Sequence, residues 1–340
     1  MNPSDTAQPV ESEGLDWQAF AENWQPSARR RLFLITGGCG FIGSHLVDAL
    51  LAMGHDVRVL DDLSTGKRSN IPEDQVELII GDVADPATVG RAMKDVDGCF
   101  HLAAIASVQR ANDDWSEVHR INMAGTVAVF EAAGKAGKNG EPIPVVYASS
   151  AAVYGDSDDP VLTEDSETVP QSAYGADKLA SELQAHVAGL VHHVPTIGFR
   201  FFNVYGPRQD PASPYSGVIS IFAHRISEGK PITIYGDGQQ TRDFIYVGDV
   251  IPHLIAGIDK ASTDAPVFNV CTGETTSILE LARTIAHLVQ TKPKIQFEDA
   301  RPGDIRHSQG DPSEAEEYLR VSAETELEEG LGELIDSIRV

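Results

Sequence analysis

The stretch RLFLITGGCGFIGSHLVDALLAMGHDVRVLDD, residues 31–62, decides the fold of this chain. Its apolar run at residues 32–35 predicts a buried parallel strand, and residues 44–53 carry the spacing of a helix that ends at Gly54. Residues 57–60 predict a second strand. A strand, a glycine turn, a helix and a second strand in this order are typical of one unit of a doubly wound α/β sheet.

Three glycines follow the first strand, Gly37, Gly40 and Gly43, in the spacing G-x-x-G-x-x-G. Glycines let the backbone turn tightly and approach a pyrophosphate, whose charge the helix N-terminus meets. Asp61 ends the second strand, where a carboxylate accepts from a ribose 2′-hydroxyl and repels a 2′-phosphate. The stretch therefore predicts a site for NAD rather than NADP, with adjacent Asp62 as a second candidate for this role. Without this context, a glycine triplet would indicate only a tight turn.

The 340-residue chain is long enough for two lobes that share an interface, or for one large domain with an insertion. It carries 51 acidic and 26 basic side chains, which gives a formal net charge of −25. Nucleic acids and anionic membrane surfaces repel such a chain, so we expect neither as a partner. The acidity indicates either an ordinary solvated surface or a protein from a salty cell, and composition leaves both interpretations open.

The cysteines and the hydropathy of the sequence indicate in which cellular compartment the protein is expected. Cys39, Cys99 and Cys271 lie far apart and form no C-x-x-C pair, which is typical of a reducing cytoplasm. No run approaches the ~18 apolar residues of a membrane helix, and the first residues lack a basic start followed by an apolar core. We therefore expect a cytoplasmic protein without a membrane span.

Residues 1–29 precede the first strand and form an acidic, polar N-terminal extension. Its large apolar groups are Trp17, Phe20 and Trp24. Two interpretations remain open: a short helix that docks these rings on the body or on a partner, and a frayed tail.

Further apolar runs predict parallel strands at residues 76–80, 98–102, 145–148 and 196–202. Asp82 lies just beyond the first of these runs, where its carboxylate either contacts an adenine ring or caps the helix after Pro86. Ala103 belongs to a turn of small residues that lets the backbone approach the cofactor. His101, in the strand before that turn, is expected to be structural rather than catalytic.

Two serines end the strand at residues 145–148, in the segment SSAAVYG at 149–155. Hydroxyls at the carboxyl end of a parallel strand face the cofactor crevice. Tyr174 and Lys178 follow on a predicted helix, four positions apart and therefore on one face. A nearby ammonium favours a phenolate, so Lys178 would make Tyr174 a better base than a free tyrosine with a pKa of ~10. For this pair alone, an ordinary surface pair at helical spacing is the alternative.

The second half of the chain alternates short predicted strands with loops that carry arginine. Asn203 follows an apolar strand, and Arg208, Arg242 and Arg301 lie in loops rich in glycine and proline. In a chain this acidic, such arginines indicate a site for an anionic group such as a diphosphate. For any one of them a solvated salt bridge is an equal alternative. The last predicted helices lie at residues 277–290, 313–319 and 323–338.

The motifs TGGCGFIG, VLDD, HLAA, SSAAVYG, YGADK, FFNVYGPRQDP, GDGQQTRDFIYVGDV and RPGD occur in this order. With them the chain resembles the extended short-chain dehydrogenase/reductase family over residues 31–340. It looks most like the nucleotide-sugar 4-epimerases typified by UDP-galactose 4-epimerase. The resemblance implies an α/β fold, with a Rossmann-like doubly wound parallel sheet and a smaller C-terminal α/β substrate-binding lobe.

We accordingly divide the chain into three parts. Residues 1–29 are the extension, residues 30–205 with about 241–262 the NAD-binding Rossmann domain, and residues 206–240 with 263–340 the UDP-sugar-binding domain. The resemblance also implies a homodimer formed through two helices of each nucleotide-binding lobe.

The same resemblance implies residue roles. Tyr174 would be the catalytic base, Ser150 its hydroxyl partner and Lys178 their cationic neighbour. Ser150 is preferred to Ser149 because the family's serine lies four residues before the tyrosine of VYG, here Tyr154. The residues implied for NAD are Gly37, Gly40, Phe41, Ile42, Gly43, Asp61, Asp82, Val83, Ala103 and Lys178. Those implied for the UDP-sugar are Asn203, Arg208, Arg242, Arg301, Asp304 and Ser308. No metal site is expected.

The reaction implied is C4 epimerisation of a UDP-sugar through a transient 4-keto intermediate, with NAD retained during turnover. Related dehydratases and the decarboxylating branch carry an acidic residue after the catalytic hydroxyl, where this chain has Ala151 and Ala152. Ser308 stands where many glucose-specific members carry a bulky aromatic residue, which leaves room for an N-acetyl group. We therefore predict UDP-GlcNAc/UDP-GalNAc as substrates, with UDP-Glc/UDP-Gal as a second pair.

Two alternatives remain at this point. A UDP-glucuronate 4-epimerase or decarboxylase of the same fold would need an extra positive or hydroxyl donor for the C6 carboxylate, and no such residue stands out in the sequence. A non-catalytic NAD-binding scaffold is disfavoured because Ser150, Tyr174 and Lys178 are all present.

Overall fold

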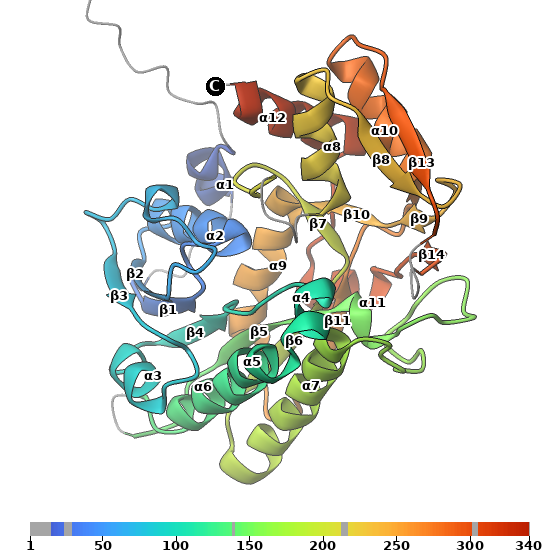
Figure 1. Ribbon diagram of the computed structural model, residues 1–340. Helices are drawn as coiled ribbons and strands as arrows, with labels where there is room; N and C mark the ends of the chain where they lie inside the picture. Colours follow the sequence, from blue (N-terminus) through green and yellow to red (C-terminus); the bar gives the residue numbers. More distant parts are fainter. Residues whose placement is uncertain (1–14, 24–28, 138–139, 212–216, 301–304, 340) are drawn as a thin grey trace, which may run out of the picture.

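The computed structural model describes residues 15–23, 29–137, 140–211, 217–300 and 305–339 of the chain. A seven-stranded parallel sheet forms the centre of its larger lobe (Figure 1). The strand order is β11-β6-β5-β4-β1-β2-β3, so the chain starts inside the sheet, winds to one edge and returns to build the other. The strands are β1 (Leu32–Thr36), β2 (Asp56–Asp61), β3 (Glu77–Ile80), β4 (Gly98–His101), β5 (Val145–Ser150), β6 (Thr196–Phe201) and β11 (Val267–Val270). The predicted α/β fold with a doubly wound parallel sheet is confirmed.

Helices cover both faces of this sheet because its side chains alternate between two apolar cores. Phe33 and Ile35 of β1 belong to one core, and Leu34 between them belongs to the other. The first core is closed by α2 (Phe41–Ala52) and α9 (Val247–Lys260). The second is closed by α3 (Pro86–Ala92), α6 (Gly125–Ala133) and α7 (Ala173–His192).

The connection after β4 is built from short helices. These are α4 (Val108–Asp113), α5 (Trp115–His119) and a π-helical turn, η2 (Arg120–Ala124). In that turn the buried Asn122 accepts from the Ile105 N–H at 2.8 Å and donates to the Ile105 carbonyl at 3.2 Å. These two bonds hold the loop that follows β4 over the carboxyl edge of the sheet. The 3₁₀ helices η1 (Arg68–Asn70) and η3 (Ala151–Val153) lie in the loops after β2 and β5.

The smaller lobe has its own apolar core, to which α8 (Val218–Ser227), α10 (Ile278–Leu288) and α12 (Leu327–Arg339) contribute. Short strands complete it. They are β7 (Asn203–Tyr205) with β10 (Phe244–Tyr246), β8 (Ile232–Tyr235) with β13 (Ile295–Glu298), and the set β9 (Thr241–Arg242), β12 (Thr276–Ser277) and β14 (His307–Ser308). Figure 1 shows this lobe above the carboxyl ends of the large sheet.

One part of the expected division needs correction. It assigned residues 263–340 to the smaller lobe, whereas β11 is the edge strand of the large sheet and pairs in parallel with β6. The helix α11 (Ser313–Leu319) packs on β11 and α9, and its Ala315 and Leu319 belong to the first core of the sheet. Both elements therefore belong with the larger lobe, because their apolar side chains are buried there. The remainder of the division stays a proposal.

Two predicted helix boundaries also shift. The helix after the glycine turn begins at Phe41 rather than at residue 44. The last helix begins at Leu327 rather than at residue 323, because the Asp249 carboxylate accepts from the Glu324 and Thr325 N–H groups at 3.3 and 3.1 Å and holds that segment in a loop. Within the described ranges no helix is long and apolar enough to cross a membrane.

Part of the N-terminal extension is a helix, α1 (Trp17–Asn23), which packs against α2. Asp16 caps it, since its carboxylate accepts from the Gln18 and Ala19 N–H groups at 3.1 and 2.9 Å. Trp17 and Phe20 pack edge to face, at 5.7 Å between ring centroids, and both lie against the first core. Of the two interpretations, the docked helix therefore describes this segment. Trp24 lies outside the described residues.

Candidate functional site

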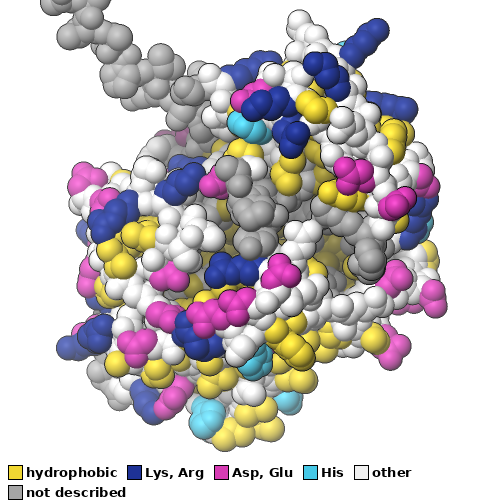
Figure 2. Space-filling view, viewed as in Figure 1, with side chains coloured by type: hydrophobic (Ala, Val, Ile, Leu, Met, Phe, Trp, Pro, Cys, Tyr) yellow, Lys and Arg dark blue, Asp and Glu magenta, His cyan; other side chains and the backbone are white. Residues whose placement is uncertain are grey.

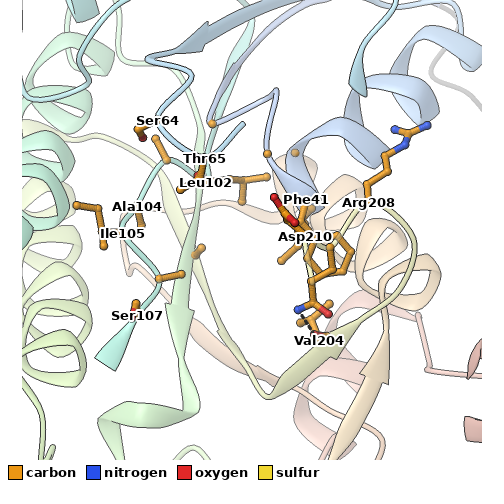
Figure 3. Close-up of a pocket in the computed structure, with 18 of the residues that line it drawn as sticks. Phe41, Ser64, Thr65, Leu102, Ala104, Ile105, Ser107, Val204, Arg208 and Asp210 are labelled. Atoms are coloured by element: carbon orange, nitrogen blue, oxygen red, sulfur yellow. Dashed lines mark hydrogen bonds between the residues drawn. The ribbon is translucent and has the colours of Figure 1, made fainter. Parts of the chain in front are cut away.

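A cavity of about 750 Å³ lies between the carboxyl edge of the large sheet and the smaller lobe. It is lined by the glycine turn, the ends of β2, β4 and β5, the start of α7 and the segment after β6. Figure 3 shows the side chains that reach it from these elements, with Ser64, Thr65 and Leu102 on one side and Phe41, Val204 and Asp210 on the other. The cavity thus lies where open α/β sheets bind their ligands.

The glycine turn has no space for side chains. Gly37 has φ +72°, and a Cβ there would lie 2.8 Å from the Ala103 backbone nitrogen. A Cβ on Gly43 would overlap the Gly37 carbonyl oxygen. Because α2 begins at Phe41, the unpaired N–H groups of its first turn follow this bare backbone directly. Gly37, Gly40, Phe41, Ile42, Gly43 and Ala103 all line the cavity, and the cradle they form fits a pyrophosphate.

Asp61 is buried at the end of β2 and is held by the backbone. Its carboxylate accepts from the Cys39 N–H at 2.9 Å and from the Leu63 N–H at 2.8 Å. Burial raises the pKa of Asp61, and these two N–H groups act in the opposite direction. Asp62 also lines the cavity, although its carboxylate accepts from the Ser64 N–H at 2.9 Å. Both carboxylates therefore remain candidates for a ribose hydroxyl.

Asp82 lines the cavity together with Val83, and one of its two predicted roles is wrong. The cap of α3 is Asp85, whose carboxylate accepts from the Ala87 and Thr88 N–H groups at 3.2 Å each. Asp82 instead accepts from the Ala84 N–H at 2.8 Å and from Arg120 Nη1 at 2.7 Å. The adenine role remains a prediction for Asp82.

The three predicted catalytic side chains all line the cavity. Ser150 ends β5 and lines the cavity together with Tyr174, and its hydroxyl accepts from the Ala152 N–H at 3.2 Å. Tyr174 lies in the first turn of α7, which Ser172 caps. Lys178 lies one turn later, with Nζ 5.8 Å from the Tyr174 ring centroid and donating to the Ala148 carbonyl at 2.7 Å. These contacts bring a hydroxyl, a phenol and an amine to one wall.

Burial dominates the electrostatics of this wall. It raises the pKa of Tyr174, while the hydrogen bond with Ser150 lowers it. Burial also lowers the pKa of Lys178 to about 8, against the opposite effect of Asp177 and Glu182. The sequence-based expectation was that the lysine field would lower the tyrosine pKa. Removal of the phenol from water is the largest effect on the pKa of Tyr174.

Ser149, the alternative hydroxyl, is engaged elsewhere. It is buried and donates to Glu182 Oε1. Arg200 of β6 holds the same carboxylate with two bonds, Nε to Oε1 at 3.0 Å and Nη2 to Oε2 at 2.8 Å. This buried ion pair under the catalytic wall was not predicted. The available signal was an arginine within an otherwise apolar strand, which needs a buried partner.

His101 is buried and structural in its contacts, as expected. Its Nδ1 lies 2.8 Å from the Thr36 hydroxyl and its Nε2 lies 3.0 Å from the Thr126 hydroxyl. Burial lowers its pKa to about 3, so the ring is neutral at physiological pH.

The predicted substrate residues are more scattered. Asn203 and Arg208 line the cavity, but the Arg208 guanidinium donates to Asp48 at 2.6 Å and to the Asn70 carbonyl at 3.2 Å. Figure 3 shows this side chain extending away from Phe41 and Asp210. Arg242 and Ser308 face each other across the β9–β14 pair, and neither belongs to the described cavity lining. Arg301 and Asp304 lie outside the described residues.

Several polar cavity residues were missed by sequence reasoning. They are Lys67, Arg110, Gln209, Asp210 and His224, all from loops or helix ends. Lys67 and Asp210, which both line the cavity, form an ion pair at 3.2 Å. Only contacts between segments far apart in sequence bring these residues together, so no local spacing indicates them. Among the described residues no cluster of histidine, cysteine, aspartate or glutamate could hold a metal ion.

Comparison with known proteins agrees with this geometry. Residues 33–271 match the NAD dependent epimerase/dehydratase family. The chain is 37% identical over 312 residues to UDP-glucose 4-epimerase of Mycolicibacterium smegmatis, covering 90% of this chain and 98% of that protein. Among solved structures, it resembles the UDP-N-acetylglucosamine 4-epimerase from Methanobrevibacter ruminantium M1 in complex with UDP-N-acetylmuramic acid. That likeness has a TM-score of 0.85 at 34% identity and covers 92% of this chain and 99% of that one.

A second solved structure extends the range of sugars bound by similar proteins. The UDP-glucuronic acid 4-epimerase from Bacillus cereus, in complex with UDP-glucuronic acid and NAD, has a TM-score of 0.83 at 30% identity. It covers 91% of this chain and 99% of that one. The glycine cradle, the acidic end of β2 and a family match over residues 33–271 agree with one another, and the chain belongs to the NAD-dependent epimerase/dehydratase family.

Proposed function

We propose that this protein epimerises a UDP-sugar at C4. The observation that carries the proposal is the meeting of Ser150, Tyr174 and Lys178 on one cavity wall beside the glycine cradle. The residues after Ser150 are Ala151 and Ala152, so η3 offers no carboxyl group for the second proton transfer of an elimination. This combination favours epimerisation over dehydration.

The residues divide the work as follows. Tyr174 takes the proton of the sugar 4-hydroxyl, and Ser150 hydrogen-bonds to its phenol. Lys178, anchored on the Ala148 carbonyl, holds its amine near the ring and within reach of a ribose hydroxyl. NAD, when bound, supplies the acceptor and donor of the C4 hydride. The resulting 4-keto sugar turns over within the cavity and receives the hydride on its other face, while Tyr174 returns the proton.

Turnover without added cofactor tests this proposal. The purified protein is incubated with UDP-Glc, UDP-Gal, UDP-GlcNAc, UDP-GalNAc and UDP-glucuronate, and products are identified by NMR. We expect interconversion of C4 epimers, because NAD is retained from one turnover to the next. Loss of water or of carbon dioxide from the sugar would contradict epimerisation, and no reaction with any of them would refute the activity.

Within this reaction we propose UDP-GlcNAc/UDP-GalNAc as the preferred pair, with UDP-Glc/UDP-Gal as a second pair. Support comes from the small side chain of Ser308 in β14, four positions after the RPGD motif in the sequence. Ser308→Tyr is expected to lose activity on the N-acetylated pair while retaining it on the plain hexoses. Ser308→Ala, which keeps the position small, is the matched control and is expected to keep the preference. A wild-type preference for plain hexoses, or a tyrosine variant that loses neither activity, would contradict the assignment.

A specific observation favours a second candidate substrate, a UDP-uronate. Arg110 at the end of α4 lines the cavity, and a guanidinium suits a C6 carboxylate. The UDP-glucuronate arm of the same experiment decides between the two. A uronate epimerised faster than both neutral pairs would replace the N-acetylated sugars as substrate.

We further propose that the protein works as a homodimer in the cytoplasm. Leu183, Val187, Leu190 and Val191 form an exposed apolar stripe on α7, with Leu183 and Leu190 63% and 67% exposed. Figure 2 shows apolar side chains gathered at the foot of the molecule, where α7 ends. Val127 is exposed on the neighbouring α6. An apolar face formed by two helices is suited to binding a second copy of the same protein.

The proposed compartment is supported by the cysteines. All three are buried and unpaired, as a reducing compartment would allow.

A further inference from the structure

The helix α1 lies before the residues that match the family, and nothing yet gives it a task. It packs on α2, the helix that begins at the glycine turn (Figure 1). Leu15, just before it, approaches α9 so closely that a Cβ on Gly248 would lie 2.9 Å from the leucine methyl. The extension is therefore seated on two helices of the larger lobe.

Trp17 of this helix contacts His45 of α2. Their ring centroids are 6.1 Å apart, and Phe41, which lines the cavity, packs on the same imidazole at 6.1 Å. His45 is 2% exposed. Two aromatic neighbours and burial leave this ring little freedom to change rotamer.

His45 in turn holds the backbone of Pro207. Its Nε2 lies 3.0 Å from the Pro207 carbonyl oxygen, and because a carbonyl only accepts, Nε2 carries the proton. Burial and the nearby Arg208 lower the pKa of His45 to about 4, so this neutral tautomer persists at physiological pH. Nδ1 makes no hydrogen bond to any described residue.

The turn that His45 holds has an unusual backbone. Gly206 has φ +151°, and Arg208, which is not a glycine, has φ +67°. A left-handed residue with a side chain costs about 1 kcal/mol or more and persists only where its surroundings hold it. Here α2 holds it twice, through His45 and through the Asp48 carboxylate, which accepts from Arg208 at 2.6 Å.

The residues directly after this turn form a wall of the cavity. They are Gln209, Asp210 and Pro211, of which Gln209 contacts α8 of the smaller lobe. Gln209 accepts from Ser220 of α8 and Asp210 pairs with Lys67, so a shift of the turn would displace both contacts. The His45 ring is therefore one of the contacts that fix the position of this wall.

We infer that Trp17 is a positioning residue for the substrate side of the cavity, acting through His45 on the Pro207–Arg208 turn. The inference rests on the proposed binding of a UDP-sugar there. With the turn held in advance, binding does not need to order it, and affinity for the nucleotide part rises. The Ser150–Tyr174–Lys178 wall belongs to β5 and α7, whereas α2, on which Trp17 packs, also carries Phe41 of the glycine cradle. Because the His45 imidazole bonds the Pro207–Arg208 turn directly, loss of Trp17 is expected to act mainly on substrate binding, with a smaller effect on NAD retention and none on the chemical step.

Calorimetric titration with UDP itself, together with KM and kcat for the preferred UDP-sugar, tests the inference in the full-length protein. Trp17→Ala is expected to weaken UDP affinity and raise KM by about fivefold, with kcat and NAD content within about twofold of wild type. Trp17→Phe keeps a ring on His45 and should restore most of the affinity. His45→Phe removes the donor to Pro207 and should weaken UDP as Trp17→Ala does, whereas His45→Gln keeps a donor and should recover binding. Phe297→Ala, which truncates an exposed ring on β13, is the control for loss of an aromatic side chain.

The outcomes separate this inference from the proposed function. Equal UDP affinity in wild type and Trp17→Ala would overturn the inference alone, even if the variant melted at a lower temperature. A fall in kcat or NAD content as large as the loss of UDP affinity would also overturn it, because α1 would then support the whole fold. A wild-type protein that binds no UDP would refute the proposed function and this inference together.

Discussion

At the scale of single residues, the site combines a base with an environment that opposes its ionisation. Tyr174 is withdrawn from water, which raises its pKa, and only the hydrogen bond with Ser150 acts against this effect. Lys178 has its own pKa lowered to about 8, so its positive charge fades as pH rises above that value. Further positive charge beside the ring would favour the phenolate.

Replacement of the base gives the clearest prediction at this scale. Tyr174→Phe removes the one hydroxyl that can take the sugar proton and leaves the ring in place, so kcat should fall by about 10³-fold or more. Binding of UDP and retention of NAD should persist, because no contact of the glycine cradle or of the Pro207–Arg208 turn involves that hydroxyl. Single-turnover kinetics and calorimetry measure the two effects. Normal turnover in this variant would show that another group is the base.

At the scale of elements, the sequence predicted those helices and strands whose formation depends on neighbouring residues. Local sequence features predicted three consecutive elements, β1, α2 and β2. These features are the apolar runs at residues 32–35 and 57–60 and the glycines between them. The errors concern long-range partners. Asp85 rather than Asp82 caps α3, and β11 joins the large sheet, because pairing and burial across the fold decide both. The same reason hid Arg110 and the Glu182–Arg200 pair, and the roles of Arg242 and Ser308 remain predictions.

The exposed stripe on α7 gives a prediction at the scale of one element. Leu183→Glu combined with Leu190→Glu places two negative charges on the proposed dimer face. Because these charges replace apolar contacts between the two copies, the double variant should be a monomer. Sedimentation velocity measures the mass of both proteins. Val169→Glu, at an exposed position in a loop, introduces a comparable charge away from the stripe and should not change the mass. An unchanged dimer in the α7 double variant would place the interface elsewhere.

At the scale of the whole molecule, polar contacts join both ends of α9 to neighbouring segments. Asp249 at the start of α9 holds the loop before α12, and Arg31 before β1 bonds Asp259 at the end of α9 at 2.6 Å. Within α9 itself, burial keeps one histidine neutral at physiological pH. His253 of α9 is buried and lies with Nδ1 2.7 Å from the Asp249 carbonyl, to which it donates. The protein carries more acidic than basic side chains. An ordinary acidic surface and an adaptation to salt are compatible with the same fold, so only the stability of the protein can distinguish them.

The buried histidines predict how stability depends on pH. Burial lowers the pKa of His253 to about 4, well below the model-peptide value near 6.5. Because the folded state binds the proton less tightly than the unfolded chain, the stabilisation is complete above pH 6.5 and is lost as pH falls towards 4. When the pH is lowered from 7.5 to 5, His253 should reduce the free energy of unfolding by about 2 kcal/mol. The His253→Gln variant lacks this contribution because glutamine does not bind a proton in this range. Buried carboxylates such as Asp243, whose pKa burial raises, shift stability in the opposite direction but do so equally in both proteins. Urea unfolding of wild type and variant at pH 7.5 and 5 therefore isolates the histidine, and an equal loss of stability in both would contradict its neutral, buried role.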